Sequence, residues 1–125
     1  MDLIRHSGDG LPAVRAYGDG GFRIGADRFE GCILVSAAGV LPLPFTEISG
    51  FDADCARAIR DGEPRPDILF IGTGAAMAGL DPKVRDILRS AGIAVDCMAT
   101  GAACRTYNVA LGEGRRVAAL LIAVP

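Results

Sequence analysis

Residues 67–98 read DILFIGTGAAMAGLDPKVRDILRSAGIAVDCM, and this stretch decides the fold class of the chain. It opens on a short continuous apolar run, residues 68–72, which is typical of a strand in a sheet covered on both faces. A second apolar run, residues 93–98, predicts the next strand. A helix is expected between the two runs, so the stretch predicts a β-α-β unit.

The helix of this unit has clear start and stop signals. Asp81 is a good N-cap, Pro82 stands at the first helical position, and Gly92 is placed to end the helix. Apolar residues at positions i, i+3, i+4 and i+7 form one stripe: Val84, Ile87, Leu88 and Ala91. These features predict an amphipathic helix between the two strands.

A second helix and a third strand are expected after this unit. Thr100 is predicted to cap a helix that Gly112 ends, and residues 116–124 are predicted to form a buried strand. The residues that line up on one side of this helix are Cys104, Tyr107 and Leu111. The order is β-α-β-α-β, and right-handed crossovers lead us to expect both helices on the same face of the sheet.

The first half of the chain is predicted to form β-hairpins. Clusters of Gly and Asp at residues 18–21 and 25–27 supply the positive φ values that tight hairpins need. Pro42 and Pro44 cannot donate ladder hydrogen bonds, so the segment around them is edge strand or loop. A short helix is expected at about residues 52–61. The first strands then pair at the sheet edge or cover its other face.

The composition fits a single α/β domain over residues 1–125. Half of the residues are hydrophobic and 22% are charged, which indicates a globular protein. Thirteen basic and fifteen acidic residues leave a net charge of −2, and the chain has two Tyr, five Phe and no Trp. We expect no nucleic-acid partner, because neither a positive field nor aromatic platforms are present.

The cysteines and the single histidine predict neither a metal site nor disulfides. Four cysteines occur without any CxxC spacing: Cys32, Cys55, Cys97 and Cys104. His6 is predicted to be a surface residue near the N-terminus. The first ten residues are too polar for a signal peptide, and the longest apolar run, residues 117–124, is too short to span a bilayer. We therefore expect reduced, mostly buried thiols in a cytoplasmic protein that does not insert into a membrane.

The glycine-rich turn after the first strand of the unit raises the question of a nucleotide cofactor. Gly72 and Gly74 fit a dinucleotide fingerprint, but Met77 stands where the third glycine belongs. The helix is not expected to begin before Asp81, and the lysine of a phosphate-binding loop is missing. We expect no cofactor, and we interpret the glycines as letting the backbone pass close to its neighbours.

The stretch TGAACRTYN, residues 100–108, is a more informative candidate site. Parallel strands bring it to the same, carboxyl edge of the sheet as the glycine turn, where open α/β folds bind ligands. The candidate residues for a small ligand or an anion are Gly72, Thr73, Gly74, Thr100, Cys104, Arg105 and Asn108. Arg105 is disfavoured near a helix N-terminus unless it faces an anion or a carboxylate. The alternative is that Arg105 pairs with a local acid and Asn108 ties down a loop.

Cys104 lies in the same helical turn as Arg105. Nearby positive charge lowers the pKa of a thiol and favours a nucleophile, but the usual base is missing because His6 is remote in the sequence. We therefore expect a packed core thiol and predict no catalytic residue.

The stretch EGRR, residues 113–116, leads into the last strand and so belongs at the opposite, amino edge of the parallel strands. One interpretation is a salt-bridged turn. The other is a partner-binding surface that includes Glu113, Arg115 and Arg116, because exposed Arg is enriched at interfaces. The two interpretations are compatible.

These pieces together resemble a known family. The segments PDILFIGTG, TGAACRTYN and EGRR follow one another in the order found in the domain of unknown function 498. This domain is shared by mitochondrial complex I assembly factor 3 proteins and many small bacterial proteins. The similarity is close over residues 66–122 and weaker over residues 17–35. It implies a three-layer α/β fold with a central mixed sheet, and it implies no established reaction.

Two functions follow as hypotheses. The first is a non-enzymatic protein-interaction or assembly-factor-like domain, which the resemblance and the lack of a recognisable acid/base pair, metal cluster or activated nucleophile both favour. The second is a small-molecule or anion binder, or a weak enzyme, that uses the carboxyl edge of the parallel strands.

Overall fold

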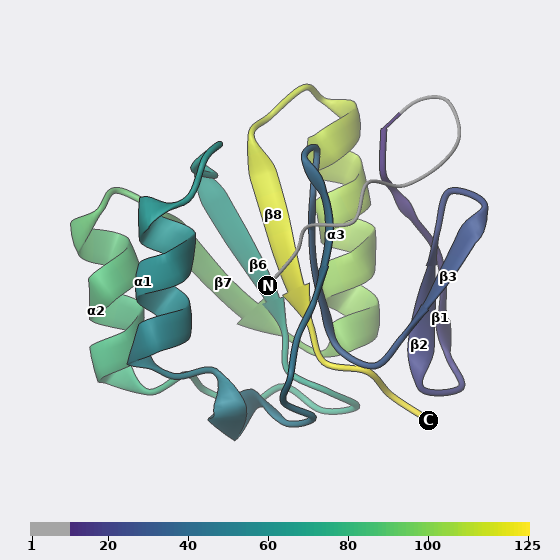
Figure 1. Cartoon of the computed structure of the whole chain (residues 1–125), viewed down its shortest axis with the longest axis horizontal. Helices are drawn as coiled ribbons and strands as arrows, with labels where there is room; N and C mark the ends of the chain where they lie inside the picture. Colours follow the sequence, from purple (N-terminus) through teal and green to yellow (C-terminus); the bar gives the residue numbers. More distant parts are fainter. Residues whose placement is uncertain (1–10) are drawn as a thin grey trace.

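The computed structural model describes residues 11–125 (Figure 1). Its strands are β1 (Val14–Gly18), β2 (Gly21–Ile24), β3 (Asp27–Glu30), β4 (Ile33–Ser36), β5 (Gly39–Pro42), β6 (Ile68–Gly72), β7 (Ala94–Met98) and β8 (Val117–Leu121). Its helices are the short 3-10 helix η1 (Ile48–Gly50), α1 (Ala53–Asp61), α2 (Pro82–Ser90) and α3 (Thr100–Gly112). The β-α-β-α-β order predicted for the second half is confirmed. The predicted surface position of His6 lies outside the described residues.

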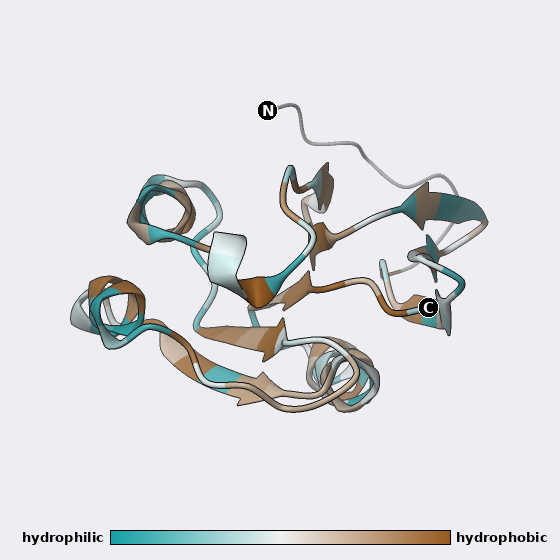
Figure 2. Cartoon of the chain, turned by 90° about the horizontal axis from the view of Figure 1, so that it is seen from below, coloured by the Kyte–Doolittle hydropathy of each residue, from teal (hydrophilic) through white to brown (hydrophobic). Residues whose placement is uncertain are grey.

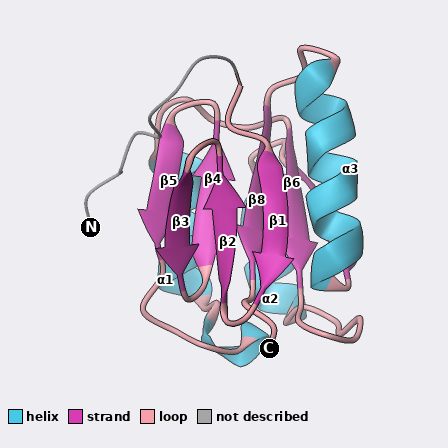
Figure 3. Ribbon diagram, turned by 90° about the vertical axis from the view of Figure 1, so that its right-hand side faces the viewer, coloured by secondary structure: helices cyan, strands magenta, loops and turns pink. Residues whose placement is uncertain are grey.

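The central sheet has five strands in the order β5-β4-β8-β6-β7. β6 runs parallel to both of its neighbours, with Phe70 opposite Asp96 in β7 and opposite Ala119 in β8. β4 pairs antiparallel with β8, and β5 pairs antiparallel with β4. The strands β1, β2 and β3 form a separate antiparallel sheet in front of β4 and β8 in Figure 3. The predicted mixed sheet with added N-terminal hairpin strands is confirmed.

The boundaries of α2 follow the predicted capping signals. Asp81 accepts a hydrogen bond from the N–H of Lys83 at 2.9 Å, which satisfies a free donor of the first turn of α2. The N–H of Cys55 donates in the same way to Asp52, at 3.0 Å, at the start of α1. Gly92 follows α2 with a φ of 83°, a value that glycine adopts without strain.

The expectation that both crossover helices lie on one face of the sheet is wrong. β6 lies between β7 and β8, so the crossover through α2 and the crossover through α3 run in opposite directions across the sheet. Two right-handed crossovers in opposite directions must lie on opposite faces. Figure 2 shows α1 and α2 on one side of the sheet, with α3 and the small sheet on the other.

Each face of the central sheet has its own hydrophobic core, so the molecule has three layers. On one face Phe70 packs among α3 and the small sheet, together with Tyr107 and Phe22. On the other face Leu69 packs with the helix α2 through Leu88. The three-layer α/β fold is confirmed.

The two faces are covered unequally. The small sheet covers β4 and β5 on the α3 side, where Ile33, Val35 and Val40 pack with Phe22 and Ile24. On the other side α1 packs against α2, and the two helices contribute to the core over β6 and β8. Among residues 11–125, helices therefore leave part of the β4–β5 face on the α1 side uncovered. Within residues 11–125, no helix is long and apolar enough to cross a membrane.

Candidate functional site

Of the predicted ligand residues, Gly72, Thr73, Gly74 and Thr100 lie together at the carboxyl edge. The turn after β6 meets the start of α3, where Thr100 is fully buried and donates from Oγ1 to the carbonyl oxygen of Ile122 at 2.8 Å. The same oxygen accepts from the N–H of Gly74 at 3.0 Å. Thr100 is therefore not the N-cap of α3, as the sequence had suggested. The N-cap residue is Ala99, and the Thr100 hydroxyl joins β6 to β8 instead.

The glycine turn is shaped by close packing. A Cβ atom on Gly72 would lie 2.9 Å from the Cα of Thr100, so only glycine lets the strand end this close to α3. Thr73 donates from Oγ1 to the carbonyl oxygen of Ala76 at 2.8 Å and accepts from the N–H of Ala78 at 2.9 Å. These bonds close the turn, and the N–H of Thr73 donates to the carbonyl oxygen of Met98 in β7 at 2.9 Å.

The predicted residues on α3 have different environments. Cys104 is 2% exposed, and burial raises the pKa of its thiol to about 12, although the charge of Arg105 acts to lower it. Asn108 accepts from the N–H of Val14 and donates to the Val14 carbonyl oxygen, both at 2.8 Å, so it ties β1 to α3. Arg105 is exposed and makes no ion pair with any residue between 11 and 125. Cys104 is the packed core thiol that we expected.

The predicted partner-surface residues lie at the opposite, amino edge of the parallel strands. Arg116 pairs with Asp67 at 3.2 Å, and both side chains are exposed. Arg116 also accepts a backbone hydrogen bond from Asp67, so the turn before β8 is held to the start of β6. Arg115 and Arg116 line a groove, whereas Glu113 does not.

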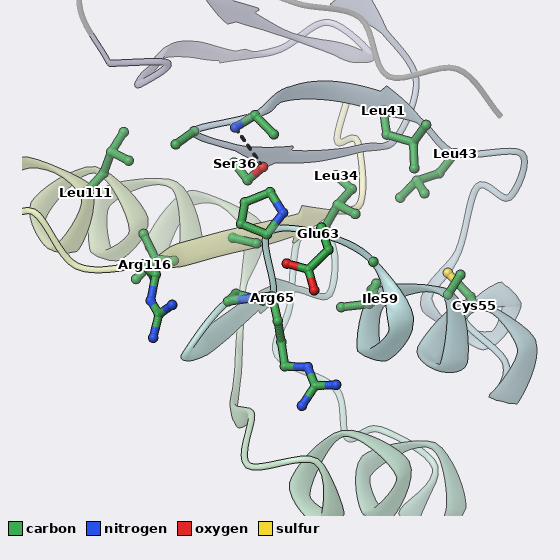
Figure 4. Close-up of a pocket in the computed structure, with 18 of the residues that line it drawn as sticks. Leu34, Ser36, Leu41, Leu43, Cys55, Ile59, Glu63, Arg65, Leu111 and Arg116 are labelled. Carbon is green, nitrogen blue, oxygen red and sulfur yellow. Dashed lines mark hydrogen bonds between the residues drawn. The ribbon is translucent and has the colours of Figure 1, made fainter.

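This groove was not predicted from the sequence. It lies between α1 and the β4–β5 hairpin, and the turn after α3 closes one end (Figure 4). Its volume is about 710 Å³, within the range of ligand-binding cavities. Its apolar lining includes Leu34, Leu41, Leu43, Phe45, Ile59 and Ala118. We call it the β4–β5 groove.

The groove follows from the alternation of side chains along β4 and β5. Ile33 and Val35 point into the core on the α3 side, so Leu34 points to the opposite face, toward the groove. In the segment LPLPF, the apolar side chains of Leu41 and Leu43 alternate with prolines and line the same groove. This period of two was a signal in the sequence, but the order of the strands was needed to show that no helix within residues 11–125 covers these leucines.

The outer edge of β5 is closed to a further strand. The N–H of Leu43 donates to the carbonyl oxygen of Cys32 at 2.9 Å, which continues the register that pairs Leu41 with Leu34. Alternate residues therefore turn their N–H toward β4, and positions 40, 42 and 44 turn away from it. Pro42 and Pro44 have no N–H to offer. A partner at this corner would bind the groove face and not the strand edge.

The described residues offer little for metal or thiol chemistry. No group of three or more His, Cys, Asp or Glu residues between 11 and 125 could hold a metal ion. All four cysteines are free thiols in the structure, and burial also raises the pKa of Cys55, to about 11. Thiols with raised pKa values are poor nucleophiles at neutral pH.

Comparison with other proteins places the chain among proteins of unknown function. A family model described as a protein of unknown function (DUF498/DUF598) matches residues 14–122. An uncharacterized protein of Rhodobacter capsulatus is 37% identical over 116 residues, which cover 93% of this chain and 88% of that protein. In Xenopus tropicalis, NADH dehydrogenase (ubiquinone) 1 alpha subcomplex assembly factor 3 is 30% identical over 109 residues, which cover 87% of this chain. This alignment spans only 60% of the assembly factor.

Two solved structures show the same fold. The crystal structure of a Bartonella henselae protein, described as an outer membrane protein, has a TM-score of 0.81 and 36% identity. It covers 93% of this chain and 100% of its own. The solution structure of a Bordetella pertussis protein, described as a Mth938-like domain, has a TM-score of 0.80 and 29% identity. It covers 98% of this chain and 92% of its own.

Proposed function

The chain belongs to the DUF498/DUF598 family of proteins of unknown function, and from this membership we propose that it is a non-enzymatic protein-interaction domain. In this proposal it binds a segment of a partner protein in the β4–β5 groove. Its action is then like that of its relative from Xenopus tropicalis, which is an assembly factor.

The observation that carries the proposal is the open apolar face of β4 and β5. Leu34 and Leu41 of the central sheet, and Leu43 directly after β5, remain partly exposed. Partly exposed apolar side chains that gather in one groove are typical of an interaction site. The groove also carries Arg115 and Arg116 at its rim, and arginine is enriched at protein interfaces.

The carboxyl edge supports the second hypothesis less well. Thr73, Thr100 and Asn108 have their side-chain polar atoms in hydrogen bonds to the protein's own backbone. Of the candidate polar side chains, only Arg105 is left without a partner among residues 11–125. We therefore favour the groove as the functional site.

Site-specific cross-linking in the native cell tests this function. A photo-reactive amino acid replaces Leu43 in the groove, and in a matched control it replaces Val109, which is 64% exposed on α3. We expect the groove position to cross-link one partner protein that the control position does not reach. Equal cross-linking from both positions, or none from Leu43, contradicts the proposal.

We also propose that the chain acts in the cytoplasm. Four free thiols support this location, because secreted proteins commonly pair their cysteines in disulfides. The Bartonella henselae relative is described as an outer membrane protein, so cell fractionation is the direct test. Recovery with the membrane fraction after a high-salt wash contradicts a cytoplasmic location.

A further inference from the structure

The two ends of the β4–β5 groove carry opposite charges. The register of β4 and β8 sets Ser36 beside Ala118, so the β4–β5 turn and the turn before β8 lie at the same end. Arg115 and Arg116 line this basic end, together with Glu63 and with Arg65, whose guanidinium donates to the carbonyl oxygens of Arg60 and Ala91. Asp52 and Asp54 line the other, acidic end, where α1 begins.

The charged side chains at the two ends differ in whether they already form ion pairs within the protein. Arg115 makes no ion pair with another residue in the range 11–125. Arg116 is paired with Asp67, and Asp54 with Arg57 at 3.0 Å, but these pairs are exposed. Exposed ion pairs are weak and exchange readily with other partners. The groove thus has an apolar floor between a basic end and an acidic end.

A segment that binds in this groove needs hydrogen-bond partners for its own backbone N–H and C=O groups. An extended peptide would need strand partners, and Pro42 and Pro44 remove the N–H donors from the outer side of β5. A helix pairs its backbone groups internally and presents an apolar stripe to a hydrophobic groove. α1 already lies along one wall, so a bound helix would extend the helical layer formed by α1 and α2 over β4 and β5.

We propose that the β4–β5 groove binds an amphipathic helix of a partner protein whose two ends carry opposite charges. The acidic end of that helix lies over Arg115, and its basic end lies over Asp52 and Asp54. The four-residue strands of the floor are about 13 Å long. A helix of about 14 residues is about 21 Å long, so it extends beyond both ends of these strands. This inference rests on the proposed function and names the chemistry of the partner.

Three synthetic peptides test the charge arrangement. Each has about 14 residues with leucines on one helical stripe. The first carries glutamates at one end and lysines at the other, the second carries glutamates at both ends, and the third carries lysines at both ends. Their affinities for the full chain are measured by fluorescence anisotropy at low and at high salt.

We expect the peptide with opposite ends to bind about five- to tenfold more tightly than either of the others, since each matched end adds a surface charge pair. The difference should shrink at high salt, because exposed charges are screened. In the Arg115→Glu variant, the peptide with two lysine ends should gain affinity over the one with two glutamate ends. In a matched Arg105→Glu variant, on α3 at the other edge, the ranking should stay as in the wild type.

The outcomes separate this inference from the proposed function. Equal binding of all three peptides, with the Leu43 cross-link intact, overturns the charge arrangement and leaves the interaction function standing. No peptide binding and no cross-link overturn both.

A further variant tests the chain's own first residues, since Leu11 lines the groove. It carries Leu3→Ser with Ile4→Ser in the full chain. If the peptides bind this variant and not the wild type, the occupant is the chain's own N-terminal segment, and the proposal is overturned.

Discussion

At the scale of single residues, Thr100 shows how the carboxyl edge is held together. Its hydroxyl donates to the Ile122 carbonyl oxygen and accepts from the Gly74 N–H, and its own N–H donates to the Gly74 carbonyl oxygen at 2.8 Å. One fully buried side chain therefore links the ends of β6, β8 and α3. The position that looked like a helix cap from the sequence is a link between three elements.

The Thr100→Val variant removes both side-chain bonds and keeps the shape of the residue. It should lower the free energy of unfolding by about 1–3 kcal/mol, because the Gly74 N–H and the Ile122 carbonyl lose a buried partner. Thr106→Val is the matched control, since the Thr106 hydroxyl donates to the Ala102 carbonyl oxygen of its own helix and makes only a weak contact, at 3.5 Å, to the sulfur of Met98 in β7. Urea unfolding measures both, and equal losses contradict the linking role of Thr100.

Gly72→Ala tests the close approach of β6 to α3. The added Cβ would lie 2.9 Å from the Cα of Thr100, so the backbone must shift, at a cost of about 1–3 kcal/mol. Gly79→Ala is the control, because a Cβ there meets nothing within 4 Å. Thermal unfolding should show a clearly lower melting temperature for Gly72→Ala alone. An unchanged melting temperature would mean that this packing is looser than described.

The buried thiol of Cys104 makes stability depend on alkaline pH. Its folded pKa of about 12 lies above the ordinary value of 9.0, so the unfolded chain loses this proton first as the pH rises. The stabilisation is complete below pH 9 and is lost as the pH rises toward 12. Cys104→Ala should therefore flatten the fall in urea midpoint between pH 8.5 and 10.5. A slope identical to the wild type would show that Cys104 is not the group responsible.

At the scale of elements, the sequence predicted which segments form helices and strands but not how the strands are ordered. Capping residues and apolar stripes are local, so Asp81 and Asp52 marked the starts of α2 and α1 correctly. The position of β8 between β4 and β6 is a long-range choice that no local pattern records. That order puts α2 and α3 on opposite faces and leaves Leu41 and Leu43 open to the groove.

The prolines at the edge of β5 should keep the sheet from growing. Replacing both, as Pro42→Thr with Pro44→Thr, restores two outward N–H groups and should promote pairing between copies of the chain. Pro82→Ala in the first turn of α2 serves as the control, since the N–H that this substitution creates lies in a helix and not at a strand edge. Light scattering should detect larger species for the double variant only. If it stays the same size as the wild type, the edge is protected by something other than proline.

At the scale of the whole molecule, an uneven three-layer architecture produces the candidate site. One side of the sheet is filled by α3 and the small sheet, and the other has two helices that leave a groove of about 710 Å³. The sequence pointed to the carboxyl edge because its glycines and Arg105 resemble ligand-binding patterns. In the structure most of those polar groups pair with the protein itself, whereas no helix or strand of the described part of the chain covers the apolar side chains of the groove.

The most direct test of this account is an NMR map of amide chemical shifts of the full chain during titration with the peptide of opposite ends. We predict that the largest shifts fall on β4, β5, α1 and the turn before β8, which surround the groove. The Leu41→Asp variant should lose these shifts, and Val109→Asp should keep them. If the largest shifts fall instead around Gly72, Thr100 and Arg105, the peptide binds at the carboxyl edge and the groove is not the functional site.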